Sequence, residues 1–164
     1  IIEAAHLFGV PADKISVVVH RESILHSAIE YIDNTVIGEL SVPDMRLCIQ
    51  YALTYPDRMP SCLEPLDFKK VGRLTFDVPD EETFTLLPLA RRCVKVGGVM
   101  TAVLNGANEE AVAMYLRDEI GFYDIYRLVS SAVDSVPFIA NPTLEEILET
   151  DRLAREAVRQ MAKL

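Results

Sequence analysis

The sequence predicts an α+β chain in which a β-hairpin region precedes a four-helix bundle. Three observations support this fold class. Strand-like stretches occur at residues 15–20, 24–32 and 35–40, prolines and glycine interrupt residues 56–79, and apolar residues recur at helical spacing from residue 86 onward. With 164 residues, half of them hydrophobic, the chain is long enough for one large or two small domains and too apolar for a disordered class.

The first part of the chain is expected to be mostly extended. Residues 1–8 resemble the second half of an amphipathic helix, without a capping residue before it, which suggests a piece of a longer chain. The apolar run at 15–20 predicts a buried strand. Residues 24–32 and 35–40 predict a hairpin, because the intervening Asp33-Asn34 tolerates a positive φ. A two-stranded hairpin is too small to stand alone, so its strands should pair with absent chain or with another subunit.

A helix is expected from Pro43 to Tyr55, since proline is favoured at the first helical position. It would carry a stripe of apolar side chains, namely Met45, Ile49, Ala52 and Leu53. The proline-interrupted segment that follows, with one short strand candidate at 74–76, predicts a connection between two domains. The predicted regions are a first domain portion at 1–58, a connecting segment at 59–80 and a helical domain at 81–164.

Four helices are expected in the helical domain, at 86–96, 101–117, 123–136 and 143–162. Gly97-Gly98 is a helix-ending signal. Thr143 with Glu146 three residues later forms a capping box. Short loops between the four helices predict a bundle.

Charge and cysteine content exclude several classes. The net charge of −9 has the wrong sign for non-specific nucleic-acid binding. No uninterrupted apolar run approaches the roughly 18 residues of a membrane-spanning helix. The three cysteines, Cys48, Cys62 and Cys93, form no C-x-x-C pair, which favours a reduced chain in the cytoplasm over a zinc or disulfide framework.

Polar residues are densest between the predicted strands. On a regular strand His20, Glu22 and His26 would share one face. Two imidazoles and a carboxylate could bind zinc or iron, but nothing else in the sequence completes such a site. Hydrogen bonding at a strand end is the simpler interpretation.

Two further motifs allow a structural and a functional interpretation. Asp44 before Met45 either caps a helix or places a soft apolar side chain against a flat ligand. Asn105-Gly106-Ala107-Asn108-Glu109 lies within a helical pattern although Asn and Gly are poor helix formers. Close packing of helices at Gly106 and Ala107 is the simpler interpretation, and a binding role is the other.

Taken in order, the motifs of this chain resemble the family of 1-deoxy-D-xylulose 5-phosphate reductoisomerases over essentially all of its length. The resemblance is carried by His20-x-x-Ser23-x-x-His26-Ser27, Tyr31-x-Asp33, Pro43-Asp44-Met45-Arg46, Tyr55-Pro56-x-Arg58, Pro65-Leu66-Asp67-Phe68, Leu74-Thr75-Phe76 and Ala102-Val103-Leu104-Asn105-x-Ala107-Asn108-Glu109. It implies the β-hairpin-containing end of a catalytic α/β domain, a connection and the C-terminal helical bundle of that family.

The resemblance also implies where the chemistry lies. Ser23 and Met45 would line the nicotinamide pocket for NADPH. His26 would orient a metal-binding carboxylate without binding the metal itself. The acidic ligands for the divalent metal, Mn²⁺ or Mg²⁺, would lie upstream of Ile1, with the NADPH-binding domain, so no catalytic residue and no metal ligand is assigned here. The hairpin would extend the sheet across a two-fold homodimer interface.

The implied reaction converts 1-deoxy-D-xylulose 5-phosphate to 2-C-methyl-D-erythritol 4-phosphate in non-mevalonate isoprenoid biosynthesis, and the chain alone would be inactive. The alternative is a non-catalytic module for dimerisation or partner binding. It is favoured by Arg21 and Glu22, which replace the Pro and Gln usual in the family's His-Pro-Gln-Ser motif. The coding sequence upstream of Ile1 would separate the two.

Overall fold

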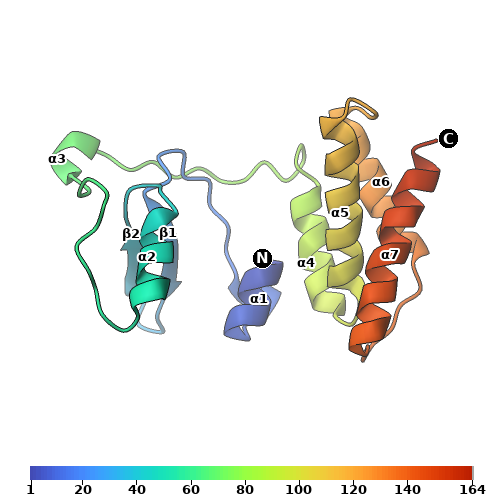
Figure 1. Cartoon of the computed structure of the whole chain (residues 1–164), viewed down its shortest axis with the longest axis horizontal. Helices are drawn as coiled ribbons and strands as arrows, with labels where there is room; N and C mark the ends of the chain where they lie inside the picture. Colours follow the sequence, from blue (N-terminus) through green and yellow to red (C-terminus); the bar gives the residue numbers. More distant parts are fainter. Residues whose placement is uncertain (164) are drawn as a thin grey trace. The chain divides into compact units, whose positions relative to one another are not determined.

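The computed structural model describes residues 1–163, which form seven α-helices, one short 3₁₀ helix and a two-stranded antiparallel sheet (Figure 1). Their contacts divide the chain into a helical unit, residues 1–17 with 80–164, and a hairpin unit, residues 18–79. The chain therefore leaves the helical unit after residue 17 and returns to it once. The predicted limits of the regions 1–58, 59–80 and 81–164 stay a prediction.

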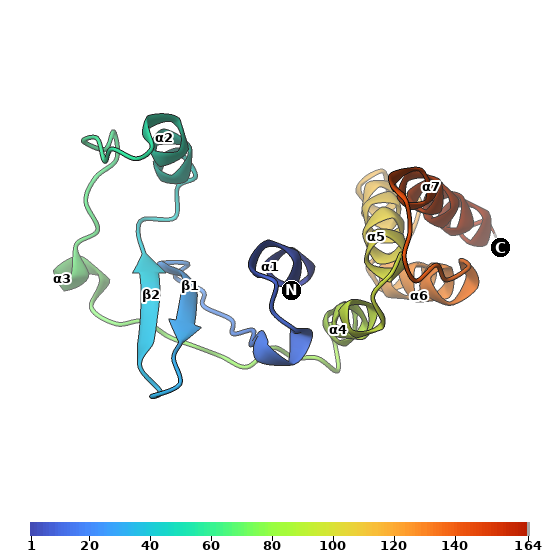
Figure 2. The same cartoon turned by 90° about the horizontal axis from the view of Figure 1, so that it is seen from below.

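The helical unit contains every helix that the sequence predicted beyond residue 81. Its elements are α1 (Ile2–Phe8), η1 (Ala12–Lys14), α4 (Leu86–Val96), α5 (Met100–Leu116), α6 (Phe122–Ser135) and α7 (Leu144–Met161). Helix α5 packs against α4, α6 and α7, and α1 packs against α4 (Figure 2). The predicted four-helix bundle is therefore confirmed, with helix ends within about a residue of the expected ones.

The core of this unit lies around α5. Its side chains Val103, Ala107 and Ala111 are completely buried, as are Leu128 and Val129 of α6. Gly106 also faces inward, and a Cβ atom there would collide with Asp151 of α7. The predicted close helix packing at Gly106 and Ala107 is confirmed, because the small residues allow α7 to approach the backbone of α5.

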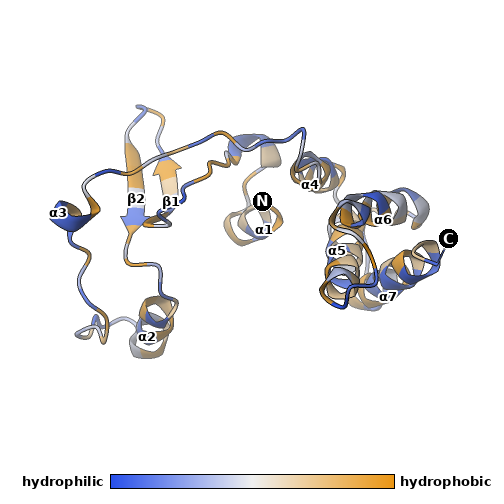
Figure 3. Cartoon of the chain, turned by 90° about the horizontal axis from the view of Figure 1, so that it is seen from above, coloured by the Kyte–Doolittle hydropathy of each residue, from blue (hydrophilic) through white to orange (hydrophobic). Residues whose placement is uncertain are grey.

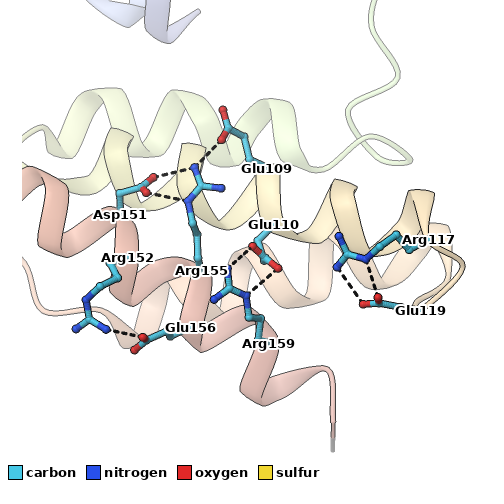
Figure 4. Close-up of polar contacts among 9 residues, drawn as sticks. All are labelled: Glu109, Glu110, Arg117, Glu119, Asp151, Arg152, Arg155, Glu156 and Arg159. Atoms are coloured by element: carbon cyan, nitrogen blue, oxygen red, sulfur yellow. Dashed lines mark hydrogen bonds and ion pairs between the residues drawn. The ribbon is translucent and has the colours of Figure 1, made fainter.

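Ion pairs join α7 to α5 beside this close contact (Figure 4). Arg159 donates to both carboxylate oxygens of Glu110, at 2.9 and 2.8 Å. Arg155 lies between Glu109, at 2.5 Å, and Asp151, at 2.8 Å. The side chain of Glu110 is only 11% exposed, so its charge needs the guanidinium. The hydrogen bonds from Arg159 hold the pKa of Glu110 below its ordinary range.

The hairpin unit contains β1 (Leu25–Glu30), β2 (Val36–Leu40), α2 (Arg46–Thr54) and α3 (Phe68–Val71). The strands are antiparallel, with Ile29 opposite Ile37. Asn34, in the turn between them, has a φ of 65°. The predicted hairpin and its turn chemistry are therefore confirmed.

Large apolar side chains of the hairpin are exposed. Ile29 and Ile37 are 62% and 58% exposed, and the two strands contain strongly apolar stretches (Figure 3). Because Ile29 and Ile37 lie opposite each other on one face of the sheet, they form an apolar surface that the rest of the hairpin unit leaves exposed. Within those residues, no helix has both the length and the apolar character that crossing a membrane requires.

Three expectations about the hairpin unit are wrong. Residues 15–20 form no buried strand: only Val19 pairs with Asp77, and Val18 is 57% exposed. Residues 74–76 form no strand either. Helix α2 begins at Arg46, later than predicted, and its stripe of Met45, Ile49 and Leu53 faces solvent. An apolar run becomes a strand only beside a partner, and the sheet of the hairpin unit contains β1 and β2 alone, so Val19 is left with a single bridge to Asp77. The single-turn helix α3 was not predicted.

The capping box of α7 provides a test of local stability. Thr143 Oγ1 accepts a hydrogen bond from the Glu146 amide at 3.2 Å, and the Glu146 carboxylate accepts one from the Thr143 amide at 2.7 Å. Thr143→Ala is expected to lower the free energy of unfolding by about 1 kcal/mol, measured by urea denaturation, because the Glu146 amide loses its acceptor. Thr143→Ser keeps the hydroxyl and should stay close to the wild type; equal losses in both variants would contradict the role of the cap.

The Glu110–Arg159 pair provides a second test. Glu110→Gln is expected to lower the free energy of unfolding at neutral pH by roughly 1–2 kcal/mol, a value discounted because Arg159 is half-exposed. Glu109→Gln is the control, since Glu109 is 54% exposed, and it should lower the free energy of unfolding less than Glu110→Gln does.

The same pair predicts a pH dependence. Because the pKa of Glu110 is lowered in the folded state, its contribution is present above the ordinary value of 4.5 and is lost as the pH falls through the lower folded-state value. The stability difference between wild type and Glu110→Gln should therefore shrink below pH 4.5. A difference that stays constant down to strongly acidic pH would show that the charge of Glu110 contributes nothing.

Candidate functional site

The candidate site begins at the turn before β1, where His20 and Glu22 contact the returning segment of the chain. His20 Nδ1 donates to the Thr75 carbonyl at 2.8 Å, and the Thr75 hydroxyl donates to Glu22 Oε1 at 2.7 Å. The His20 ring stacks on Phe76 with a centroid distance of 4.8 Å. Its side chain is only 6% exposed. Residues that are 55 apart in sequence thus form one compact polar cluster.

The protons of this cluster can be placed by counting donors. Nδ1 of His20 lies 2.8 Å from the Thr75 carbonyl and 3.0 Å from Glu22 Oε2. The carbonyl can only accept, so the proton lies on Nδ1 and points to Thr75. Nε2 of His20 and Oε2 of Glu22 are then buried without a hydrogen-bond partner among the described residues. The Thr75 hydroxyl lowers the pKa of Glu22, which therefore stays ionised.

Two more contacts fix the same turn to the same segment. The backbones of Val19 and Asp77 exchange two hydrogen bonds, each 2.9 Å long. Arg21 Nε lies 3.6 Å from Asp77 Oδ2. Each of the four residues 19–22 therefore contacts residues 75–77. The charge of Arg21 is thus paired with Asp77, and the charged carboxylate of Glu22 accepts a hydrogen bond from the Thr75 hydroxyl.

Ser23 follows directly, at the end of the turn. Its amide donates to the His20 carbonyl at 3.1 Å, and its φ is 51°. A positive φ in a residue other than glycine costs on the order of 1–3 kcal/mol and persists only where the surroundings enforce it. The exposed Ser23 is thus held in a conformation that its own backbone does not favour.

His26 lies on β1 and contacts a different partner. Its Nε2 lies 2.9 Å from Ser41 Oγ, and Ser41 Oγ donates to the Val42 carbonyl at 3.3 Å. Ser41 Oγ therefore lies between the His26 ring and the Val42 carbonyl and contacts both. This contact fixes the orientation of the His26 ring.

Asp44 and Met45 form the start of α2. Asp44 Oδ1 accepts from the Arg46 amide at 2.9 Å, and its carboxylate binds the Arg46 guanidinium at 2.6 to 3.1 Å. These bonds lower the pKa of Asp44 to about 2. The predicted capping role of Asp44 is confirmed, and Met45 beside it is 70% exposed. A flexible thioether at this exposed position is suited to contact a flat apolar ring.

The structure brings His20 and Glu22 together and leaves His26 apart. The expectation that these three share a strand face is wrong, because a turn separates His20 from β1. Residues 1–163 contain no group of three side chains able to bind a metal. The sequence reasoning did not predict the partners Thr75 and Phe76 of this cluster, although it singled out Leu74-Thr75-Phe76 as a motif. No hydrogen bond or ion pair within residues 1–163 links Ser23, His26 and Met45 to one another.

The helical unit contains one further hollow of interest. A shallow pocket of about 360 Å³ is lined by α1, α4 and α5, through Ile1, Ile2, Glu3, Leu87, Ala90 and Asn105. The amide of Asn105 lies 3.4 Å from Glu109, which itself binds Arg155. Asn105 and Glu109 of the Asn105–Glu109 motif are thus used within the bundle.

Comparisons with known proteins agree with this arrangement. Residues 40–157 match the family model of the DXP reductoisomerase C-terminal domain. The chain is 52% identical over 159 residues to the 1-deoxy-D-xylulose 5-phosphate reductoisomerase of Symbiobacterium thermophilum, and 49% identical to that of Caldanaerobacter subterraneus subsp. tengcongensis. These matches cover 97% and 96% of this chain but 41% and 42% of the relatives. The chain therefore spans less than half of their length.

Solved structures show the same fold. The reductoisomerase from Zymomonas mobilis in complex with NADPH superposes with a TM-score of 0.91 at 39% identity, covering 99% of this chain and 43% of that one. A DOX-P reductoisomerase in complex with NADPH, fosmidomycin and magnesium gives 0.91 at 36% identity, with 99% and 42% covered. The resemblance seen in the motifs and the α+β fold class are confirmed. On the sequence match and the shared fold together, the chain belongs to the DXP reductoisomerase C-terminal domain family.

Proposed function

We propose that this chain is the C-terminal part of an NADPH- and divalent-metal-dependent reductoisomerase that converts 1-deoxy-D-xylulose 5-phosphate to 2-C-methyl-D-erythritol 4-phosphate in the cytoplasm. One observation carries the proposal: relatives that bear this name are 44–52% identical to the chain over nearly its whole length. The chain alone is proposed to be inactive, since it corresponds to 41% of its first relative.

The chain's contribution to NADPH binding is proposed to be Ser23 and Met45. NADPH, when bound, supplies the hydride for the reduction step. The exposed Met45 offers a polarisable apolar surface to the nicotinamide ring. Ser23, fixed by its turn, offers a hydroxyl to the polar edge of the ring. The two residues therefore position the cofactor and take no part in proton transfer.

The chain's contribution to the metal site is proposed to be indirect. A divalent ion, Mn²⁺ or Mg²⁺, would act as a Lewis acid toward the substrate oxygens, and the carboxylate ligands would come from chain preceding Ile1. His26 would orient one of these ligands. Its ring is oriented by Ser41, and a hydrogen-bonding partner of this kind tunes ligand orientation in metal sites.

The apolar surface of the hairpin is proposed to form a homodimer interface. Ile29 and Ile37 lie opposite each other and are more than half exposed. Both strands of the two-stranded sheet also have one unpaired edge within residues 1–163, and an exposed edge of this kind favours sheet extension. A second copy related by a two-fold axis would cover both features at once.

The rival function, a non-catalytic module for dimerisation or partner binding, loses its main support. Its support in the sequence is the pair of charges at Arg21 and Glu22, but Asp77 and Thr75 bind these charges within the hairpin unit. The coding sequence upstream of Ile1 still separates the two proposals. A sequence with acidic metal ligands upstream of Ile1 favours the enzyme, and an unrelated sequence favours the module.

The test of the proposed function uses the whole open reading frame that contains this chain. Its product should oxidise NADPH in the presence of 1-deoxy-D-xylulose 5-phosphate and Mn²⁺ or Mg²⁺. Removal of the metal with EDTA should abolish the oxidation, and added metal should restore it. The 164-residue chain, used as the control, should show no activity, no saturable Mn²⁺-dependent rise in melting temperature and no tight NADPH binding. NADPH oxidation that persists in EDTA would overturn the proposed metal dependence.

The dimer is tested with Ile37→Glu in the same full-length protein. A carboxylate on the apolar face should shift the mass measured by light scattering from dimer to monomer, because burying an unpaired charge is unfavourable. Lys95→Glu, which changes an exposed residue of α4, should leave the dimer intact. If the Ile37→Glu variant remains dimeric, the hairpin is not part of the interface.

A further inference from the structure

We propose that the returning segment Thr75–Asp77 is a positioning device that holds Ser23 in the conformation needed for NADPH binding, with Thr75 as its central residue. This inference rests on the proposed function, since it assigns a purpose to the turn that presents Ser23. It concerns residues that lie far from Ser23 in sequence. Thr75 is a positioning residue, because it acts through Glu22 and His20.

The first step of the argument is the density of contacts on the turn. Every residue from 19 to 22 contacts the segment 75–77, through backbone pairing, an imidazole-carbonyl hydrogen bond, ring stacking, an ion pair and a hydroxyl-carboxylate hydrogen bond. Ser23 is the next residue along the chain. A short exposed turn gains nothing in regular secondary structure from so many contacts, so they serve to fix its geometry.

The second step is the conformation of Ser23 itself. With a φ of 51°, Ser23 is among the few residues outside glycine that have a positive φ in residues 1–163. Its amide is bonded to the carbonyl of His20, the residue that the segment holds most tightly. Release of His20 would remove the constraint that keeps Ser23 in this conformation. The exposed hydroxyl of Ser23 would then sample other positions.

The third step identifies Thr75 as the residue whose side chain joins the segment 75–77 to the turn at residues 19–22. Its carbonyl accepts from His20 and its hydroxyl donates to Glu22. Only the second contact depends on the side chain, so it can be removed without altering the backbone. Valine has nearly the same shape as threonine without the hydroxyl, and serine keeps the hydroxyl. The chain thus offers a matched pair of variants at a position outside the proposed binding machinery.

The experiment compares Thr75→Val and Thr75→Ser in the full-length protein. Thr75→Val should raise the Kd for NADPH, followed by the fluorescence of the bound nucleotide, and the KM for NADPH by about tenfold, the effect of losing one hydrogen bond to a charged group. The KM for the sugar phosphate should change less than about twofold, because the hydrogen bond lies on the cofactor side. Thr75→Ser should restore both NADPH constants nearly to wild-type values.

A second pair of variants tests the same bond from its other end. Glu22→Ala removes the acceptor of the Thr75 hydroxyl, and Glu22→Gln keeps an oxygen that can accept it. If Thr75→Val does not fold, Glu22→Ala should still weaken NADPH binding, and Glu22→Gln should weaken it less. Hydrogen exchange of the full-length protein should also speed up across residues 19–23 in both disruptive variants.

The outcomes separate the inference from the function on which it rests. A wild-type protein that binds no NADPH overturns both. A wild-type protein that binds NADPH, together with disruptive variants that melt at lower temperature but bind NADPH unchanged, overturns the inference alone and leaves the segment a structural support. If Thr75→Ser weakens NADPH binding as much as Thr75→Val does, the inference is also overturned, because the hydroxyl would then be irrelevant.

Discussion

The stability of the helical unit depends on the burial of α5 by the helices that surround it. This helix has buried residues on several faces, from Met100 to Met114, and α4, α6 and α7 each pack against it. A helix that is apolar nearly all around is stable in water only inside a bundle. The small residues Gly106 and Ala107 then set how closely α7 can approach, and the ion pairs from Arg155 and Arg159 fix its position along α5. The surrounding helices are amphipathic, and they pack their apolar faces against this central helix.

The hairpin unit depends on a different constraint. With two strands it has little core of its own, and only Ile24 of its large apolar side chains is buried. Its local order comes from specific polar contacts: Ser41 with His26, Asp44 with Arg46, and Thr75 with Glu22 and His20. A chain segment held in this way has defined side-chain positions at its surface while its apolar face remains available for partners. This is the arrangement expected of a surface that completes a larger site.

Helices and hairpin were predictable from the sequence because their signals are local. The Thr143–Glu146 capping box, the Gly97-Gly98 stop and the Asp33-Asn34 turn each lie within a few residues, and each formed as expected. The buried strand at 15–20 was wrong because a run of valines specifies apolarity and cannot specify a partner strand. The start of α2 shifted because Asp44 caps the helix through the Arg46 amide, two residues beyond it.

The site was predictable only in its residue types. His20 and Glu22 stood out in the sequence, but their partner Thr75 lies more than fifty residues away, and no periodicity reports a contact of that range. The roles assigned to Ser23, Met45 and His26 came from the family resemblance and stay proposals. Their local environments, a strained turn, an exposed helix start and an imidazole ring oriented by Ser41, could be obtained only from the structure.

The pairing of Val19 with Asp77 has a consequence for the order of folding. Helix α1 precedes the hairpin unit in sequence but packs against α4, so about sixty residues of that unit lie between the two partners. Once Val19 and Asp77 have paired, the entrance and exit of that unit are joined, and the effective loop between α1 and α4 shrinks to the few residues on either side. Closure of the hairpin unit would therefore lower the entropy cost of docking α1 onto α4, which favours closure as the earlier of the two steps.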